Sequence, residues 1–188
     1  MALLAEEIVE EWLNRQGYFT IRGIRMGVHE IDLLAVKWRS DGSAECRHLE
    51  VQASMRPVSY ISRVPKSAQN VGHKANSAKR SHEELIQGVH EWVETKFRRP
   101  DKTALMKSLW NGDWSSELVL NVVKSEDEVG LIAGHGIKII WLKDIISSLA
   151  NGHFVVTSAS GSDFVDLIQM GFHAQPVAPG NVPQAARP

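Results

Sequence analysis

Glu30-Ile31-Asp32-Leu33-Leu34-Ala35 and His48-Leu49-Glu50-Val51-Gln52 are two short stretches in which polar and apolar residues alternate. An alternation with a period of two is typical of β-strands that have one apolar and one polar face. Glu30 and Asp32 therefore share the polar face of the first strand, and Glu50 lies on the polar face of the second. A short turn rich in Ser, Asp and Gly joins the stretches, so we predict antiparallel strands that each present acids on one face.

The segments around these strands predict an α/β fold with a mixed central sheet flanked by helices. A helix and a three-strand meander come first, and a later strand, short helix and strand have the order of a parallel crossover. Capping-box patterns at Ser81 and Glu84 and at Ser125 and Glu128 mark two helix starts. The expected helices cover 3–16, 82–98, 103–110, 142–150 and 163–170, with a short one after Ser125, and the expected strands cover 18–26, 29–38, 45–53, 117–124, 137–141 and 154–157.

Composition and charge fit a soluble globular protein. The chain has 188 residues, of which 43% are hydrophobic and 23% charged, with a formal net charge of -1. We predict one domain over 1–173 and a disordered Pro-rich tail over 174–188. The single Cys46 excludes an internal disulfide and fits a reducing compartment. No apolar run approaches the roughly 18 residues of a membrane helix, so we expect a cytoplasmic protein with no membrane partner.

Positive charge is concentrated in residues 53–82, which contain no Asp or Glu and which we call the basic arm. Basic runs are often only solvated surface, but this one directly follows the strand that carries Glu50. Lysine and arginine contacts to phosphates supply most non-specific affinity for nucleic acids. The residues predicted to bind nucleic acid are Arg56, Arg63, Lys66, Lys74, Lys79 and Arg80.

The order of a helix, a meander, a helix and parallel strands, with acids on the second and third strands, resembles the PD-(D/E)XK nuclease superfamily and its restriction-endonuclease-like fold. The resemblance covers about residues 3–150. Gly27, Glu30 and Asp32 match the glycine-then-Glu-Ile-Asp form of the second strand in several of its families. Glu50 and Gln52 match the third-strand Glu-x-Lys motif except at its last position.

The resemblance implies a centre for Mg²⁺ or Mn²⁺. Hydrolysis of a phosphodiester near neutral pH needs a hard cation that polarises the phosphoryl oxygen and lowers the pKa of a bound water. Magnesium prefers oxygen ligands. Asp32, Glu50 and the carbonyl of Val51 would ligate the metal. Glu6, at the margin of the first helix's apolar stripe, would reach the site directly or through a water.

Gln52 stands where the family carries its lysine. A glutamine can orient a water by hydrogen bonds but carries no charge and cannot accept a proton. More of the water activation would then fall to the metal. Of the other polar residues on these strands, we expect Glu30 to be solvated or paired with a lysine, with assistance to a second metal as the alternative. We expect His48 to form a hydrogen bond at the sheet surface, with contact to the substrate as the alternative.

The resulting functional prediction is metal-dependent hydrolysis of nucleic acid, with DNA as the expected substrate. Glu6, Asp32, Glu50 and Gln52 are the predicted catalytic residues. The alternative is a catalytically inactive nuclease-fold module that binds nucleic acid or a partner protein, and a third reading is a protein-interaction domain. The sequence leaves open whether the protein forms a homodimer.

Overall fold

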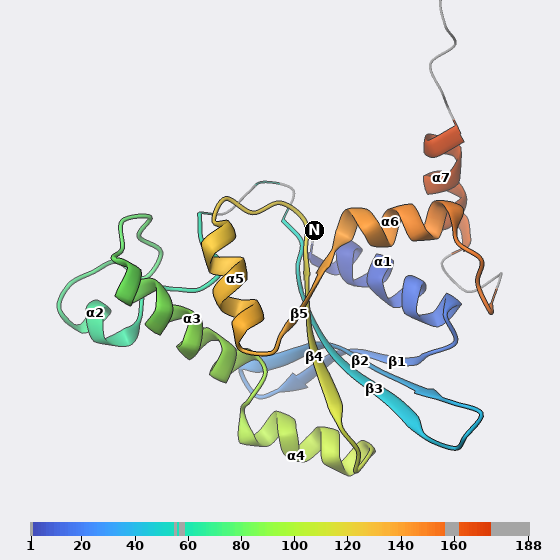
Figure 1. The fold of residues 1–188 in the computed structure, drawn as a ribbon, viewed down its shortest axis with the longest axis horizontal. Helices are drawn as coiled ribbons and strands as arrows, with labels where there is room; N and C mark the ends of the chain where they lie inside the picture. Colours follow the sequence, from blue (N-terminus) through green and yellow to red (C-terminus); the bar gives the residue numbers. More distant parts are fainter. Residues whose placement is uncertain (1, 55, 57–58, 157–161, 174–188) are drawn as a thin grey trace, which may run out of the picture.

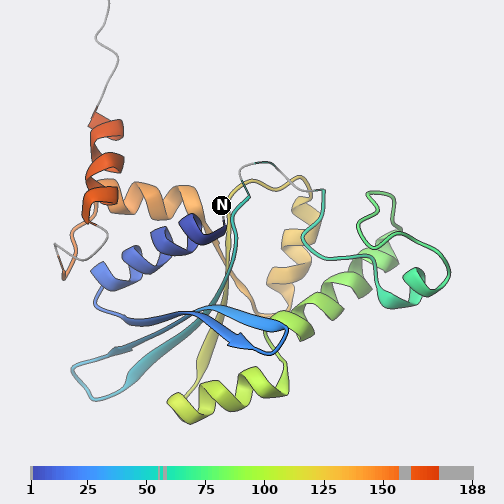
Figure 2. The ribbon, with the colours of Figure 1, turned by 180° about the vertical axis from the view of Figure 1, so that it is seen from behind.

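The fold is an α/β arrangement in which one five-stranded sheet carries helices on both faces (Figure 1; Figure 2). The structure is a computed structural model that describes residues 2–54, 56, 59–156 and 162–173. Over these residues, no helix has the length and apolar character needed to cross a bilayer. The elements are α1 (Ala2–Arg15), β1 (Phe19–Met26), β2 (His29–Trp38), β3 (Ala44–Gln52), α2 (Lys66–Asn70), α3 (His82–Lys96), α4 (Pro100–Leu109), β4 (Trp114–Leu120), α5 (Glu126–Gly134), β5 (Lys138–Trp141), α6 (Leu142–Asn151) and α7 (Ser162–His173).

The sheet is mixed and follows the spatial order β1-β2-β3-β4-β5. β1, β2 and β3 form an antiparallel meander, whereas β3 pairs with β4 and β4 with β5 in parallel. A parallel pair needs a long connection, and helices supply it: α3 and α4 lie between β3 and β4, and α5 lies between β4 and β5. The predicted α/β fold with a mixed sheet is therefore confirmed.

Each face of the sheet is covered by its own helices. α1 and α6 pack on the face that carries Leu33 and Leu49, and α3 and α5 pack on the face that carries Leu118 and Leu120. Glu50 is in register with Leu118 on the neighbouring strand, so its side chain points to the α3 side. The polar face of β3 is therefore enclosed by helices, and Glu50 is completely buried.

Several predicted elements differ from the structure. β4 covers Trp114–Leu120, where a strand over 117–124 was predicted, and α2 in the basic arm was not predicted. α4 begins at Pro100, before the predicted start, because proline is favoured in a first helical turn, where its missing N–H is not needed. The strand predicted over 154–157 is wrong for residues 154–156, because the N–H groups of Val155 and Val156 donate to the carbonyl of Arg15 and close the end of α1. The last residue of that predicted strand and the predicted tail lie outside the described residues.

The basic arm is fixed to the helices on the α3 side. The buried carboxylate of Glu128 in α5 accepts the N–H groups of Ile61 and Ser62 at 2.7 and 2.8 Å, and the Ser62 hydroxyl at 2.6 Å. The predicted capping box of α5 is therefore only half present: Ser125 accepts the N–H of Glu128, but the Glu128 carboxylate binds the arm instead. The capping box predicted for α3 is complete. The arm is thus fixed to α5 at Ile61 and Ser62.

Gly88 lies where α3 meets the arm, and an added Cβ would come within 2.5 Å of the Arg63 carbonyl oxygen. We expect Gly88→Ala to lower the free energy of unfolding by about 2 kcal/mol, although alanine favours a helix over glycine by about 1 kcal/mol. The matched control is Gly130→Ala in α5, where an added Cβ meets nothing within 4 Å; it should raise the stability by roughly 0.5–1 kcal/mol. If Gly88→Ala and Gly130→Ala change the free energy of unfolding in urea by the same amount, α3 and the arm do not approach each other as closely as the structure describes.

Candidate functional site

The candidate site lies where β2 and β3 separate, which we call the strand fork. Backbone pairing between the two strands runs from Trp38 and Ala44 to Leu33 and Leu49. Beyond that point the N–H of Val51 donates to Oδ2 of Asp32, at 2.8 Å, in place of a β2 carbonyl. In Figure 1, β2 and β3 leave their hairpin side by side and then separate. The divergence brings the Asp32 carboxylate up against the backbone of β3.

Glu50 is the most enclosed acid of the fork, and both of its oxygens are paired. Oε1 accepts from Nζ of Lys102 at 2.6 Å and lies 3.2 Å from Nε2 of His48, while Oε2 accepts from Nζ of Lys96 at 2.7 Å. Burial alone would raise the pKa of Glu50, but the His48 hydrogen bond and the two lysines outweigh it and lower the pKa below its usual value. Glu50 is therefore a buried, ionised carboxylate.

The pKa of Asp32 is shifted in the opposite direction to that of Glu50. Burial and the nearby charge of Glu50 raise the pKa of Asp32 from 3.8 to about 6, and Glu6 adds to the rise. The Val51 hydrogen bond and the Lys96 charge act in the other direction but do not cancel it. Asp32 thus sits among negative charges that the described side chains leave only partly neutralised, which is the environment in which an added cation is favoured.

Glu6 and Glu30 complete the acidic side of the fork. Glu6 projects from α1, is half-buried, and has a raised pKa, chiefly from burial and then from the charges of Glu30 and Glu50, against the lowering effect of Arg22. Glu30 is exposed and belongs to β2. The fold therefore brings acids from α1, β2 and β3 within electrostatic range of one another, although they are far apart in the sequence.

Gln52 lies at the exposed end of β3 and is in register with Leu120 of β4. Among the described residues no hydrogen bond joins its amide to Asp32 or Glu50. The positive groups that contact Glu50 come from helices: Lys96 at the end of α3 and Lys102 in α4. Positive charge therefore reaches the fork from the covering helices.

Sequence reasoning missed both lysines, although a weak signal existed for one. Lys96 follows Val93 by three residues and Val89 by seven, so it continues the buried stripe of α3. A lysine on such a stripe is expected to have an acidic partner. Lys102 gave no comparable signal. His48 was expected at the sheet surface, but the structure buries it completely, against Glu50 and the ring of Phe97.

The side chains of the fork meet some, but not all, of the requirements of a metal site. Within the described residues, no group of three or more His, Cys, Asp or Glu side chains is arranged to hold a metal ion. A magnesium site needs fewer protein ligands, because Mg²⁺ keeps several waters and is commonly bound by one or two carboxylates. Asp32 and Glu50, on neighbouring strands, supply two carboxylates, and their oxygens are the hard ligands that Mg²⁺ prefers. Both oxygens of Glu50 already accept hydrogen bonds from lysines, so a metal ion would have to compete with an ammonium group for this carboxylate.

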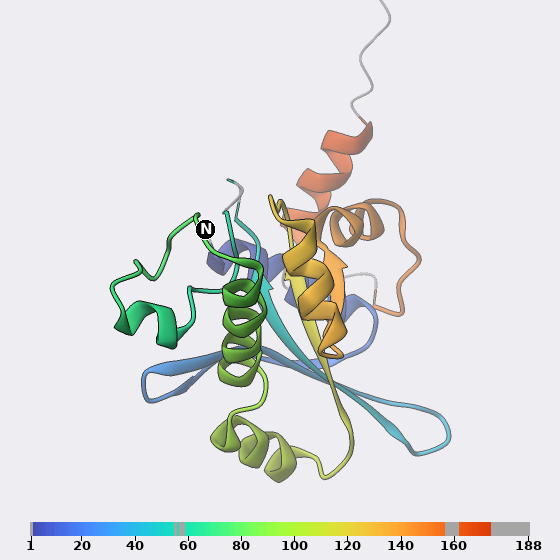
Figure 3. The ribbon, with the colours of Figure 1, turned by 60° about the vertical axis from the view of Figure 1, so that its left-hand side comes forward.

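The basic arm presents most of its charge to solvent. Figure 3 shows α2 and its flanking loops lying beside α3. Arg80 differs from the other predicted nucleic-acid contacts, because its guanidinium donates to the carbonyls of Ser62 and Ser77 and stacks on the ring of Tyr60, 3.9 Å from its centroid. Arg80 therefore has a structural role within the arm. The exposed members are Arg56, Arg63, Lys66, Lys74 and Lys79.

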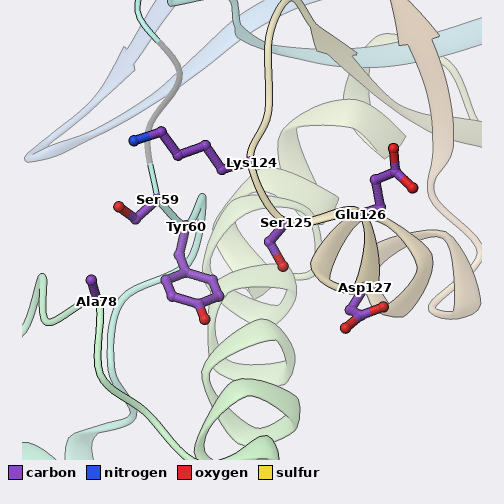
Figure 4. Close-up of a pocket in the computed structure, with 7 residues that line it drawn as sticks. All are labelled: Ser59, Tyr60, Ala78, Lys124, Ser125, Glu126 and Asp127. Atoms are coloured by element: carbon purple, nitrogen blue, oxygen red, sulfur yellow. The ribbon is translucent and has the colours of Figure 1, made fainter.

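A separate pocket of about 510 Å³ lies between the arm and the start of α5. Figure 4 shows Ser59, Tyr60 and Ala78 on the arm side and residues 124–127 on the other. The exposed acids Glu126 and Asp127 occupy the first turn of α5 here, so the amide end of this helix already faces negative charge. None of the fork acids lines this pocket.

Comparisons with known proteins do not assign the chain to a family. No protein-family model matches it, and no curated protein sequence matches it. A search of solved structures found similarity to one described as "Crystal Structure of Protein of Unknown Function AF1548", with 14% sequence identity and a TM-score of 0.41 over 89% of this chain and 78% of that one. A similarity at that level carries no argument about function.

Proposed function

We propose that the protein is a metal-dependent nuclease with a restriction-endonuclease-like core, and that it hydrolyses phosphodiester bonds of DNA at the strand fork. The observation that carries the proposal is the acid cluster of the fork, in which the Asp32 pKa is raised to about 6 by burial and by the charge of Glu50. Like charges in a buried site disfavour ionisation, and both lysines of the fork bind Glu50, so an added cation would be favoured beside Asp32.

The residues that would hold Mg²⁺ or Mn²⁺ are Asp32, Glu50 and the carbonyl of Val51, with Glu6 reaching the site directly or through a water. When bound, the metal would polarise the phosphoryl oxygen and lower the pKa of a water. The protein's own contribution is to hold these oxygen donors in place. The N–H of Val51 orients Asp32, and Lys102 orients Glu50 from the buried side.

The lysine missing from the third-strand motif has a counterpart in space. Lys96 reaches the same carboxylate from α3, with its side chain 28% exposed, so a cation is available on the open side of the site. An ammonium there would stabilise the negative charge that develops on the phosphoryl group. Gln52, at the exposed end of β3, is left with the smaller role of orienting water or substrate.

A cleavage assay tests the proposal. Purified protein is incubated with plasmid and with single-stranded DNA in the presence of Mg²⁺ or Mn²⁺, beside Asp32→Ala and Glu50→Ala variants and an EDTA control. We expect metal-dependent cleavage by the wild type and none by either variant. If the wild type and both variants cut alike, the activity comes from a contaminant and the assignment of these acids fails.

The second candidate function is an inactive nuclease-fold module that binds nucleic acid or a partner protein. Two observations favour it: Gln52 replaces a lysine at the motif position, and lysines cover both oxygens of Glu50. Salt-sensitive binding of DNA without cleavage at any metal concentration would support this reading over the first. Cleavage gained by Gln52→Lys would indicate that the missing lysine limits turnover.

The basic arm is the surface that we propose to bind the DNA backbone. A triple variant, Arg63→Ala, Lys66→Ala and Lys74→Ala, should bind DNA more weakly and lower the slope of log affinity against log salt by about 2–3, because roughly 0.9 counterion is released per phosphate contact. Binding is measured by fluorescence anisotropy over a range of salt.

The matched control removes three exposed lysines elsewhere, with Lys107→Ala, Lys138→Ala and Lys143→Ala. It makes the same change in net charge, so it should leave the salt slope close to that of the wild type. If both triple variants change the slope equally, the arm is not the binding surface.

A further inference from the structure

The two lysines that neutralise Glu50 differ in how firmly they are held. Nζ of Lys102 donates to Glu50 Oε1 and to the carbonyl of Lys96, at 2.6 and 2.8 Å, and its side chain is 1% exposed. Nζ of Lys96 donates to Glu50 Oε2 at 2.7 Å, and its side chain is 28% exposed. Lys102 is thus enclosed with two acceptors, whereas Lys96 reaches the same carboxylate from the edge of the site.

The Lys96 ammonium lies within range of three acids of the fork. Besides its contact with Glu50, it is stabilised by the charges of Asp32 and Glu30. Lys96 is also the last residue of α3. A side chain at a helix end, with a long aliphatic stem and partial exposure, can move its head group into water at low cost. Lys102 has no such route to water, because its side chain is enclosed and its ammonium donates to two acceptors, Glu50 Oε1 and the carbonyl of Lys96.

We propose that Lys96 is a displaceable internal cation: its ammonium occupies the acid cluster of the strand fork, and a divalent metal ion that binds Asp32 and Glu50 must displace it from Oε2 of Glu50, while Lys102 stays in place. This inference rests on the proposed function, because it assumes that the fork is where the metal binds. It assigns different roles to two lysines that contact the same carboxylate.

Displacement has two consequences. Metal affinity is lowered, because the ion must compete with an ammonium that already neutralises Glu50. The displaced ammonium remains tethered beside the fork, where a phosphate oxygen of the substrate would offer it a new partner. Lys96 therefore opposes metal binding in the free protein and assists the substrate-bound protein. Removing it should raise metal affinity and lower the cleavage rate, a combination that simple damage to the site does not produce.

Isothermal titration of the DNA-free protein with Mn²⁺ tests the inference. We expect Lys96→Met and Lys96→Gln to bind Mn²⁺ about tenfold more tightly than the wild type, which corresponds to the loss of one competing charge-assisted hydrogen bond. Lys96→Arg keeps the competing charge and should bind no more tightly than the wild type. Lys107→Met, on the exposed last turn of α4, is the control for a general change in net charge and should behave as the wild type.

The remaining outcomes separate this inference from the proposed function. If Asp32→Asn abolishes Mn²⁺ binding but Lys96→Met binds no more tightly than the wild type, the fork binds metal and the displacement idea is wrong. If Lys107→Met gains as much affinity as Lys96→Met, the effect is one of net charge and the idea is again wrong. If neither the wild type nor Lys96→Met binds Mn²⁺ at about 1 mM, both the inference and the metal centre fail.

Discussion

Asp32→Asn is expected to lower the cleavage rate strongly while making the metal-free protein more stable near pH 8. The native pKa of Asp32 is raised from 3.8 to about 6, so above that pH the folded state holds an ionised carboxylate in an unfavourable environment. A pKa raised from 3.8 to about 6 corresponds to roughly 3 kcal/mol at most, and we expect about 2 kcal/mol of stabilisation from the neutral amide. The amide oxygen can still accept the N–H of Val51. Cleavage should fall by about a thousandfold, because a ligand of the activating metal is lost.

The pH dependence of stability follows from the same shift. Between pH values of about 4 and 6 the folded protein binds more protons at Asp32 than the unfolded chain does, so the destabilising contribution of Asp32 should diminish as the pH falls through this range. The difference in free energy of unfolding between Asp32→Asn and the wild type should therefore become smaller as the pH falls from about 8 to about 4. Urea unfolding in EDTA at several pH values measures it. Asp113→Asn, at an exposed turn, is the control. A destabilised Asp32→Asn protein at pH 8 would contradict the strained environment of this acid.

Lys102→Met should be among the most damaging single substitutions in the fold, with a loss of about 3 kcal/mol of stability. The side chain is 1% exposed and pairs with the fully buried Glu50. Methionine has a similar volume, so the packing loss is small. What remains is a buried carboxylate that loses its enclosed counter-ion and keeps only Lys96 and His48. Removal of one partner of a buried pair is costly because the other charge stays behind.

A double-mutant cycle distinguishes this electrostatic cause from a packing defect. Glu50→Gln combined with Lys102→Met removes both charges, so the double variant should be more stable than the sum of the two single effects predicts, by about 2 kcal/mol. Lys107→Met, an exposed lysine in the same helix, should have almost no effect. If the Glu50 and Lys102 effects are additive in urea unfolding, the two side chains do not interact as the structure describes.

The alternation of residues in two strands was sufficient to predict much of the sheet. The period of two assigned Asp32 and Glu50 to polar faces, and the meander and parallel strands followed from turn residues and apolar runs. The alternation could not predict that helices cover the polar face of β3. That depends on where α3 and α4 lie, and their lysines contact Glu50 from positions 46 and 52 residues further along the chain.

The basic arm illustrates a second limit of sequence reasoning. Charge density identified the segment, but it could not distinguish Arg80, which binds carbonyls and Tyr60, from neighbours that face solvent. Likewise, the position of Gln52 in the motif could not predict that Lys96 of α3 contacts Glu50. Local patterns predict which face a side chain takes, whereas its partner is set by tertiary packing.

The most direct measurement of the central claim is the position of a bound metal. Crystals of the protein grown with Mn²⁺ and a short DNA duplex would allow the ion to be located by its anomalous scattering. We predict a peak between the carboxylates of Asp32 and Glu50, beside the carbonyl of Val51, with the Lys96 ammonium moved off Glu50 and Lys102 still in place. A fork without manganese, with Lys96 still bound to Glu50 and the metal elsewhere on the protein, would contradict the account.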